Sequence, residues 1–140
     1  MASDISGITA SAATTACGVD HVRLVYCYLD EGEFDGYASL LDEHVQVRGV
    51  GAQRASGREE AAHAARANPL GRHELHKVIA ELDSVVVTGR YLTPGGRDAE
   101  AAHFDFADVF TISDDALVLS QRRFYYLDEP PGRARSSTSP

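Results

Sequence analysis

The second half of this chain is a run of strand-like segments joined by short turns, and this feature most restricts the folds open to it. Apolar and polar residues alternate through four segments, His73 to Glu81, Ser84 to Thr93, Ala99 to Ile112 and Ala116 to Leu127. The turn sequences between them are Leu82-Asp83, Pro94-Gly95-Gly96 and Ser113-Asp114-Asp115. Turns this short join neighbouring antiparallel strands, so the sequence predicts one antiparallel sheet.

The first half of the chain has the spacing of helices. Apolar residues recur at helical intervals from about Gly18 to Glu31 and again from Phe34 to Leu41. His44 to Val50 alternates as a strand. Ser56 to Ala67 has acidic residues early and an arginine late, which favours a third helix. The predicted order is therefore helix, helix, strand, helix and four strands.

This order predicts an α+β fold: a cone-shaped barrel of a curved, mainly antiparallel β-sheet, with the three helices of the N-terminal half on its concave face. A cavity between the helices and the sheet would be the place for a small molecule. We expect a single domain over residues 16–127. The segments 1–15 and 128–140 are polar and rich in small residues, so they are expected to be flexible tails.

Composition argues against several classes of partner. The formal net charge is −8 and no block of basic residues occurs, so no nucleic-acid partner is expected. No apolar run approaches the ~20 residues that cross a bilayer, so no membrane partner is expected either. Cys17 and Cys27, in a sequence without a signal peptide, fit a reducing cytoplasm. Lys77 is the only lysine among 13 basic residues, a bias typical of GC-rich genomes such as those of actinobacteria.

Asp108 is the main candidate for chemistry. In the segment HFDFADVFTI it shares a strand face with Phe104, Phe106, Phe110 and Ile112. An ionised carboxylate there would lose its hydration, so it must be protonated, paired or turned toward a pocket. A carboxyl group in an aromatic pocket is a common acid or base. The alternative is structural, an ion pair across two strands or a polar anchor in the core.

The partners of Asp108 depend on the register of the last two strands. If Ile112 lies opposite Ala116, then Asp108 lies opposite Ser120 and Arg122 is diagonal to Asp108. With this register we expect Arg122 to reach the Asp108 carboxylate. The residues that this register places on the Asp108 face are Ser120, Arg122 and Phe124.

Tyrosine and histidine residues supply further candidates. Tyr26 lies on the apolar stripe of the first helix, where its hydroxyl could reach the cavity or simply belong to the core. Tyr91 is open to the same two interpretations. His73 and His76 are three positions apart and therefore face opposite sides of a strand, so no metal site is predicted.

Three segments resemble nuclear-transport-factor-2-like proteins. Residues 28–41 (YLDEGEFDGYASLL) resemble their helix–glycine–helix opening, residues 56–60 (SGREE) their third-helix start, and residues 106–117 (FADVFTISDDAL) their penultimate strand and turn. The polyketide-cyclase-like (SnoaL-like) and ketosteroid-isomerase-like branches are the most similar. The resemblance spans residues 19–126. It implies a cone with an apolar pocket, a homodimer through the sheet and no cofactor.

The resemblance also implies roles for particular residues. Asp108 matches the oxyanion-hole acid of the ketosteroid isomerase pattern, where a carboxylic acid stays neutral in an apolar site. The base of that pattern falls near Gly49, which has no side chain, and its tyrosine falls near Val25, one residue before Tyr26. Isomerisation of steroids by that full mechanism is therefore not expected.

The leading hypothesis is a cofactor-free cyclase or isomerase of bacterial natural-product (polyketide-type) biosynthesis. Its predicted catalytic residues are Asp108 as acid or base, Arg122 as the group that binds an enolate oxygen, and Tyr26. The predicted substrate-binding residues are Phe104, Phe106, Phe110, Ser120, Phe124 and Tyr91. The competing hypotheses are a non-catalytic accessory protein that holds a hydrophobic intermediate in the same pocket, and a dimerisation module without a ligand.

Overall fold

A computed structural model describes residues 11–50, 53–68, 71–93 and 103–126. The elements follow one another as α1 (Ala12–Glu31), α2 (Phe34–Ser39), β1 (Leu41–Val50), β2 (Gln53–Ser56), α3 (Arg58–Ala67), β3 (Arg72–Glu81), β4 (Ser84–Leu92), β5 (His103–Ile112) and β6 (Val118–Tyr126). The predicted order of helices and strands is confirmed, with β2 as an additional strand. The predicted turn at Pro94-Gly95-Gly96 and the strand residues 99–102 lie outside the described residues, as do the segments 1–10 and 127–140.

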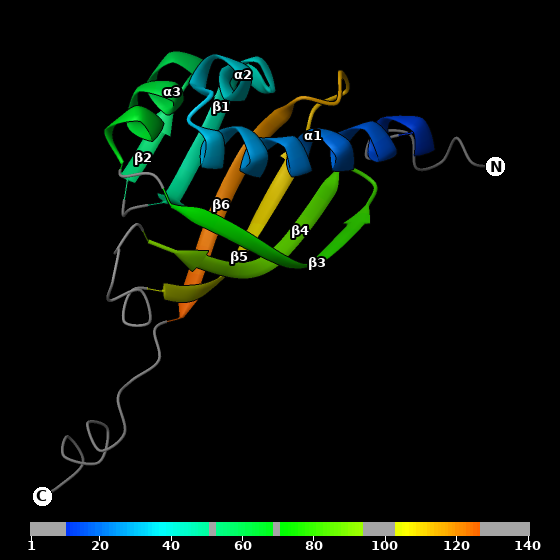
Figure 1. The fold of residues 1–140 in the computed structure, drawn as a ribbon. Coiled ribbons are helices and arrows are strands. Elements are labelled where there is room, and N and C mark those ends of the chain that lie inside the picture. The colour runs from blue at the N-terminus through cyan, green and yellow to red at the C-terminus, as the bar shows by residue number, and fades with distance from the viewer. Residues whose placement is uncertain (1–10, 51–52, 69–70, 94–102, 127–140) are drawn as a thin grey trace, which may run out of the picture.

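The strands form one curved sheet in the order β2-β1-β6-β5-β4-β3 (Figure 1). Neighbouring strands are antiparallel except β1 and β6, which run parallel. β2 and β3 lie at opposite edges, so the sheet curves without closing on itself. The predicted α+β fold with a curved, mainly antiparallel sheet is confirmed.

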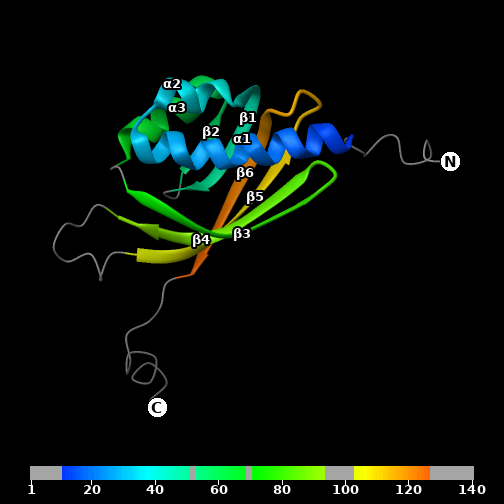
Figure 2. The same cartoon turned by 45° about the vertical axis from the view of Figure 1, so that its right-hand side comes forward.

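The helices cover the concave face of this sheet. α1 crosses the face, while α2 and α3 lie over the end formed by β1 and β2 (Figures 1 and 2). Val22, Val25 and Tyr26 are the large buried side chains of α1. The sheet residues in the same core include Val45, Val85, Val87, Phe110 and Val118. Each such side chain contributes about 1.5–3 kcal/mol when it leaves water, so this contact of helix with sheet is the main stabilising layer.

α1 begins at Ala12, earlier than the predicted Gly18. Ser11 is its N-cap, and the Ser11 hydroxyl accepts a hydrogen bond from the Thr14 amide at 3.0 Å. The Thr15 hydroxyl donates to the Leu82 carbonyl at 2.8 Å, which fastens the first turns of the helix to the turn between β3 and β4. These turns consist of small residues without an apolar stripe, so the spacing of apolar residues could not reveal them.

Two other boundaries differ around the first strand. α2 ends at Ser39, and Leu41, predicted as helical, is the fully buried first residue of β1. β2 was not predicted because its four residues carry no alternation of large apolar side chains. α3 starts at Arg58 because Gly57 before it takes φ +95°, outside the helical region.

A bulge interrupts the pairing of β5 with β6. Ile112 pairs with Val118, while Thr111 pairs with Ser120, so Leu119 between them has no partner on β5. One extra residue in a strand turns every later residue to the opposite face of the sheet. The faces of β6 beyond Leu119 are therefore the reverse of those predicted.

The turn and this bulge together make the predicted register wrong, because Ile112 pairs with Val118 and not with Ala116. Asp108 pairs with Arg123 and not with Ser120. Arg123 is buried on the concave face, and Arg122, its neighbour, pairs with Val109 on the outer face. The residues of β6 that were predicted beside Asp108 but lie on the outer face are Ser120, Arg122 and Phe124.

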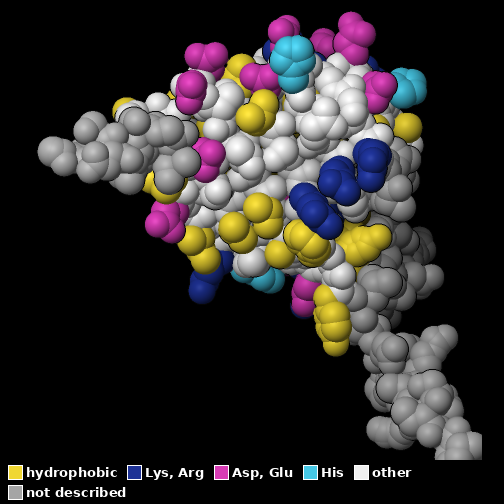
Figure 3. Space-filling model, turned by 180° about the vertical axis from the view of Figure 1, so that it is seen from behind, with side chains coloured by type: hydrophobic (Ala, Val, Ile, Leu, Met, Phe, Trp, Pro, Cys, Tyr) yellow, Lys and Arg dark blue, Asp and Glu magenta, His cyan; other side chains and the backbone are white. Residues whose placement is uncertain are grey.

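The outer face of the sheet carries a row of arginines. Arg48 of β1 pairs with Arg54 of β2 on one side and with Arg122 of β6 on the other. Figure 3 shows basic side chains in a row on this face, beside a band of hydrophobic side chains. The Arg122 guanidinium lies 4.9 Å from the centre of the Phe124 ring, so this outer arginine stacks on an aromatic side chain.

Candidate functional site

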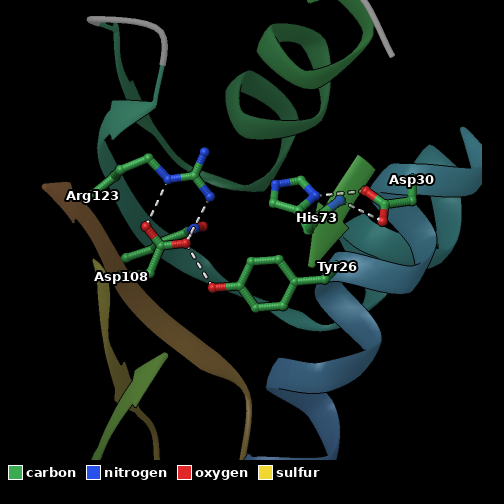
Figure 4. Close-up of polar contacts among 6 residues, drawn as sticks. Tyr26, Asp30, His73, Asp108 and Arg123 are labelled. Carbon is green, nitrogen blue, oxygen red and sulfur yellow. Dashed lines mark hydrogen bonds and ion pairs between the residues drawn. The ribbon is translucent and has the colours of Figure 1, made fainter. Parts of the chain in front are cut away.

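A buried ion pair joins β5 and β6 under α1. Asp108 Oδ1 accepts a hydrogen bond from Arg123 Nε at 2.8 Å, and Asp108 Oδ2 accepts one from Arg123 Nη2 at 2.8 Å (Figure 4). The Asp108 side chain is fully buried and that of Arg123 is 5% exposed. Two parallel bonds between a guanidinium and a carboxylate fix the orientation of both groups.

Two further donors complete the surroundings of Asp108. Oδ2 also accepts hydrogen bonds from the Tyr26 hydroxyl at 2.6 Å and from Gln121 Nε2 at 3.1 Å. All four hydrogen bonds between the described residues and this carboxyl group are accepted by its oxygens, and two of them come from a permanently charged guanidinium. The arrangement fits an ionised carboxylate, in contrast to the neutral acid of the ketosteroid isomerase pattern.

The protonation of the partners follows from burial and charge. Burial raises the pKa of the Tyr26 hydroxyl well above its usual range, and the negative charge of Asp108 raises it further. Burial lowers the pKa of Arg123, but its hydrogen bonds and attraction to Asp108 outweigh this, and the net pKa is raised. Tyr26 is therefore a neutral donor and Arg123 a permanent cation.

Aromatic rings surround this charged pair. The Arg123 guanidinium lies 4.3 Å from the centre of the Phe106 ring, within the range of a cation–π interaction. The Tyr26 ring has its centre 6.0 Å from that of Phe106 and 6.0 Å from that of Phe110. Asp108, Tyr26 and these two phenylalanines therefore lie together on the concave face of the sheet.

Other predicted site residues lie further along the same face or on the other one. Tyr91 and Phe104 contact each other, with ring centres 5.4 Å apart. Arg122 is exposed on the outer face, so the prediction that it reaches Asp108 is wrong. Ser120 and Phe124 share that outer face and cannot line the Asp108 site.

The isomerase pattern places its base near Gly49. In this structure Gly49 packs closely against the backbone of Arg123. Its φ is +87°, and a Cβ atom there would lie 2.5 Å from the Arg123 carbonyl oxygen. Any side chain would clash with the backbone of β6. The strand pairing thus rules out a catalytic base at this position.

A second polar pair, missed by the sequence analysis, lies beside Tyr26. Asp30 Oδ1 of α1 lies 2.6 Å from His73 Nδ1 of β3, and Asp30 Oδ2 accepts the His73 backbone N–H at 3.0 Å. The His73 ring centre is 5.0 Å from that of Tyr26 and 4.8 Å from that of Tyr91. The sequence drew attention to His73 only as a possible metal ligand. The described part of the chain contains no group of three or more His, Cys, Asp or Glu residues suited to a metal ion.

Comparison with known proteins identifies the family. A family model of the SnoaL-like domain matches residues 22–120, most of the chain. The chain belongs to the SnoaL-like family. The SnoaL-like family lies within the superfamily of nuclear-transport-factor-2-like folds, so the predicted relationship is confirmed. No curated protein sequence matches this SnoaL-like chain.

Solved structures share the SnoaL-like fold at low sequence identity. A candidate ketosteroid isomerase from Kribbella flavida has a TM-score of 0.69 and 18% identity, covering 86% of this chain and 87% of its own. An LEH-like epoxide hydrolase from M. tuberculosis has a TM-score of 0.69 and 18% identity, covering 80% and 84%. A candidate SnoaL-like polyketide cyclase from Jannaschia sp. CCS1 has a TM-score of 0.67 and 18% identity, covering 82% and 89%. These similarities establish the fold.

None of the described helices is both long enough and apolar enough to cross a membrane.

The two neighbouring arginines of β6 allow a matched test of the buried pair. We expect Arg123→Met to lower the free energy of unfolding by about 3–5 kcal/mol, because Asp108 is left charged, buried and without its cation. Arg122→Met, on the outer face, should change it by less than about 0.5 kcal/mol. Urea unfolding measures both. Equal effects of the two substitutions would contradict the register described above.

Tyr37 of α2 gives an expectation for alkaline pH. Its side chain is buried, and burial raises its pKa to about 12, with Arg123 lowering and Asp108 raising it. The unfolded chain loses this proton at about pH 10, so the free energy of unfolding should fall between about pH 10 and 12, by about 1.4 kcal/mol per pH unit. Tyr37→Phe should make this fall shallower. The free energy of unfolding of the variant should still fall with pH, because the pKa of Tyr26 is raised as well. Thermal unfolding across this pH range measures the slopes, and identical slopes would refute the burial effect.

Proposed function

We propose that this protein is a cofactor-free enzyme of the cyclase or isomerase type that acts on a hydrophobic small molecule. The substrate class is polyketide-like, and the setting is cytoplasmic natural-product biosynthesis in a bacterium of the actinobacterial kind. Family membership supports a small-molecule site. The aromatic residues Phe104, Phe106, Phe110 and Tyr91 on the concave face would contact such a substrate.

The observation that carries this proposal is the state of the Arg123 guanidinium. Its Nε and Nη2 bind Asp108, and no described residue hydrogen-bonds to its Nη1. Among the described residues no buried side-chain nitrogen or oxygen lacks a partner, so Nη1 must reach solvent although the side chain is 5% exposed. A fixed cation with one free donor in aromatic surroundings can stabilise an enolate or a polarised carbonyl oxygen. Arg123 thereby takes the role predicted for Arg122.

Asp108 and Tyr26 have supporting roles in this proposal. The carboxylate of Asp108 holds the guanidinium in one orientation and accepts a hydrogen bond from the Tyr26 hydroxyl. Because the pKa of Tyr26 is raised, its hydroxyl stays protonated and can share its donor with a substrate oxygen. Preorganised donors of this kind favour the developing negative charge of an enolate over the neutral ketone.

A non-catalytic accessory protein is the second candidate, and one observation favours it. Asp108 is fully buried, and all its described partners are donors of this chain. The carboxylate predicted as the acid or base is therefore occupied in the folded protein. In this alternative the same aromatic face binds a hydrophobic intermediate without reacting with it.

We also propose that the protein is a homodimer formed through the outer face of the sheet. Val109, Leu119 and Phe124 are 36%, 36% and 49% exposed on strands β5 and β6. Exposed apolar side chains gathered on one sheet face are typical of an interface between subunits.

Two probes separate the enzyme from the accessory protein. We expect anthraquinone, a planar tricyclic diketone, to raise the melting temperature in either case, because a ligand of the folded state stabilises it. Only the enzyme should accelerate exchange of the acidic C–H protons of β-tetralone into D₂O, followed by NMR. Arg123→Lys should slow this exchange by about 10²-fold, as expected for removal of an oxyanion donor. Arg122→Lys is the matched control and should leave the exchange unchanged.

Stabilisation by anthraquinone without exchange of β-tetralone would favour the accessory protein. If neither probe has an effect, both functions are wrong.

The dimer has its own test. Sedimentation equilibrium should give twice the monomer mass of 15.1 kDa, and Phe124→Asp should shift the equilibrium toward the monomer, because a charge is then buried at the interface. His63→Asp, at an exposed position of α3 away from the outer face of the sheet, adds the same charge and serves as the control. A monomeric wild-type protein at all concentrations would contradict the dimer.

A further inference from the structure

His73 is a nearly enclosed imidazole with a fixed orientation. Its side chain is 6% exposed, and its ring lies near Tyr26, Tyr91 and Phe106, with centres 5.0, 4.8 and 5.7 Å away. On one edge, Nδ1 lies 2.6 Å from Asp30 Oδ1. A carboxylate can only accept a hydrogen bond, so Nδ1 carries a proton and the neutral ring has its lone pair on Nε2.

The other ring nitrogen, Nε2, has different surroundings from Nδ1. None of the described residues bonds to it, and none of their buried side-chain nitrogens or oxygens lacks a partner. Nε2 is therefore the polar atom through which this enclosed ring reaches solvent. Figure 4 shows this edge of the ring turned away from Asp30, toward the side where Arg123 and Asp108 lie.

We propose that His73 is the proton-transfer residue of this site and that Asp30 is its positioning residue. The inference rests on the proposed function and assigns to it the base that Asp108 cannot supply. Nε2 takes a proton from a carbon next to the substrate carbonyl, and the electron pair of that C–H bond becomes the enolate. The imidazolium then returns its proton to another carbon or to the closing ring, so that no co-reactant is consumed.

The charges around His73 suit this cycle. Asp30 on α1 supplies the negative charge that compensates the imidazolium, as the third member of a catalytic triad does for its histidine. The other titratable groups on neighbouring elements are Tyr26 on α1, Tyr91 on β4, Asp108 on β5 and Arg123 on β6. Burial raises the pKa of both tyrosines, so they stay neutral beside the ring. Arg123 is then the cation available to the enolate oxygen that forms as His73 gains its proton.

The alternative is that Asp30 and His73 have a purely structural role. Asp30 also accepts the backbone N–H of His73, so the pair fastens the end of α1 to the start of β3. Substitutions in it could thus lower stability whether or not His73 transfers protons. The decisive measurement must respond to proton transfer and not to stability alone.

The experiment follows exchange of β-tetralone protons into D₂O by the wild type and by His73→Ala. We expect His73→Ala to slow the exchange by at least about 10²-fold, the usual contribution of a general base. Added free imidazole should restore at least a tenth of the wild-type rate, since it can occupy the space left by the side chain. His44→Ala is the control. The His44 side chain is exposed, and its Nε2 lies 3.3 Å from Glu43 Oε2, so it resembles His73 in having a carboxylate beside it. The rate of exchange with this variant should equal that of the wild type, with or without imidazole.

A spectroscopic measurement on the unliganded protein tests the positioning role. Long-range proton–nitrogen NMR spectra should show neutral His73 with its proton on Nδ1, and Asp30→Asn should shift the tautomer equilibrium toward Nε2–H and slow the exchange at least tenfold. A Nε2–H tautomer in the wild type would overturn the proposal, and so would exchange unaffected by His73→Ala, or a loss that imidazole does not restore.

These outcomes separate the two proposals. Unchanged exchange in His73→Ala removes His73 from the mechanism and leaves the enzyme function standing. Absence of exchange in the wild type overturns both the enzyme function and the role of His73.

Discussion

The pairing of Asp108 with Arg123 is the constraint on which the rest of this structure depends. Two opposite charges lie beneath a helix with almost no contact with water, and neither could be accommodated there alone. The pair requires β5 and β6 to be neighbours in one particular register, and it requires Tyr26 of α1 and Gln121 of β6 to supply the remaining donors. Helix and sheet are thus fixed to each other by polar geometry as well as by apolar packing.

Much of this fold could be predicted from local pattern. The ten residues of β5 alternate without interruption, so the sequence alone placed Asp108 among phenylalanines on the buried face. The helices and the strands β3 to β6 have regular apolar spacing and short connections, and their order followed from these features. The start of α1 and the whole of β2 lack such spacing, and they depend instead on a cap, on hydrogen bonds to distant backbone and on pairing with β1.

The candidate site could be predicted only in part, because its partners meet through tertiary structure. The bulge at Leu119 has no mark in the alternation of β6, and it exchanges Arg122 for Arg123 as the partner of Asp108. His73 and Asp30 are 43 residues apart and meet only when α1 lies across the sheet. Two adjacent arginines in a strand point to opposite faces, and the register assumed from the sequence placed Arg122 instead of Arg123 beside Asp108.

The unpaired Leu119 also bears on how this chain is compared with its relatives. Where a related strand lacks the extra residue, an alignment without a gap at this position would match every residue from Ser120 to Tyr126 with one from the opposite face of the sheet. Arg122 would then be aligned with interior positions and Arg123 with exterior ones. Any statement about which residues of this strand are shared among relatives therefore depends on placing that one gap from the backbone pairing.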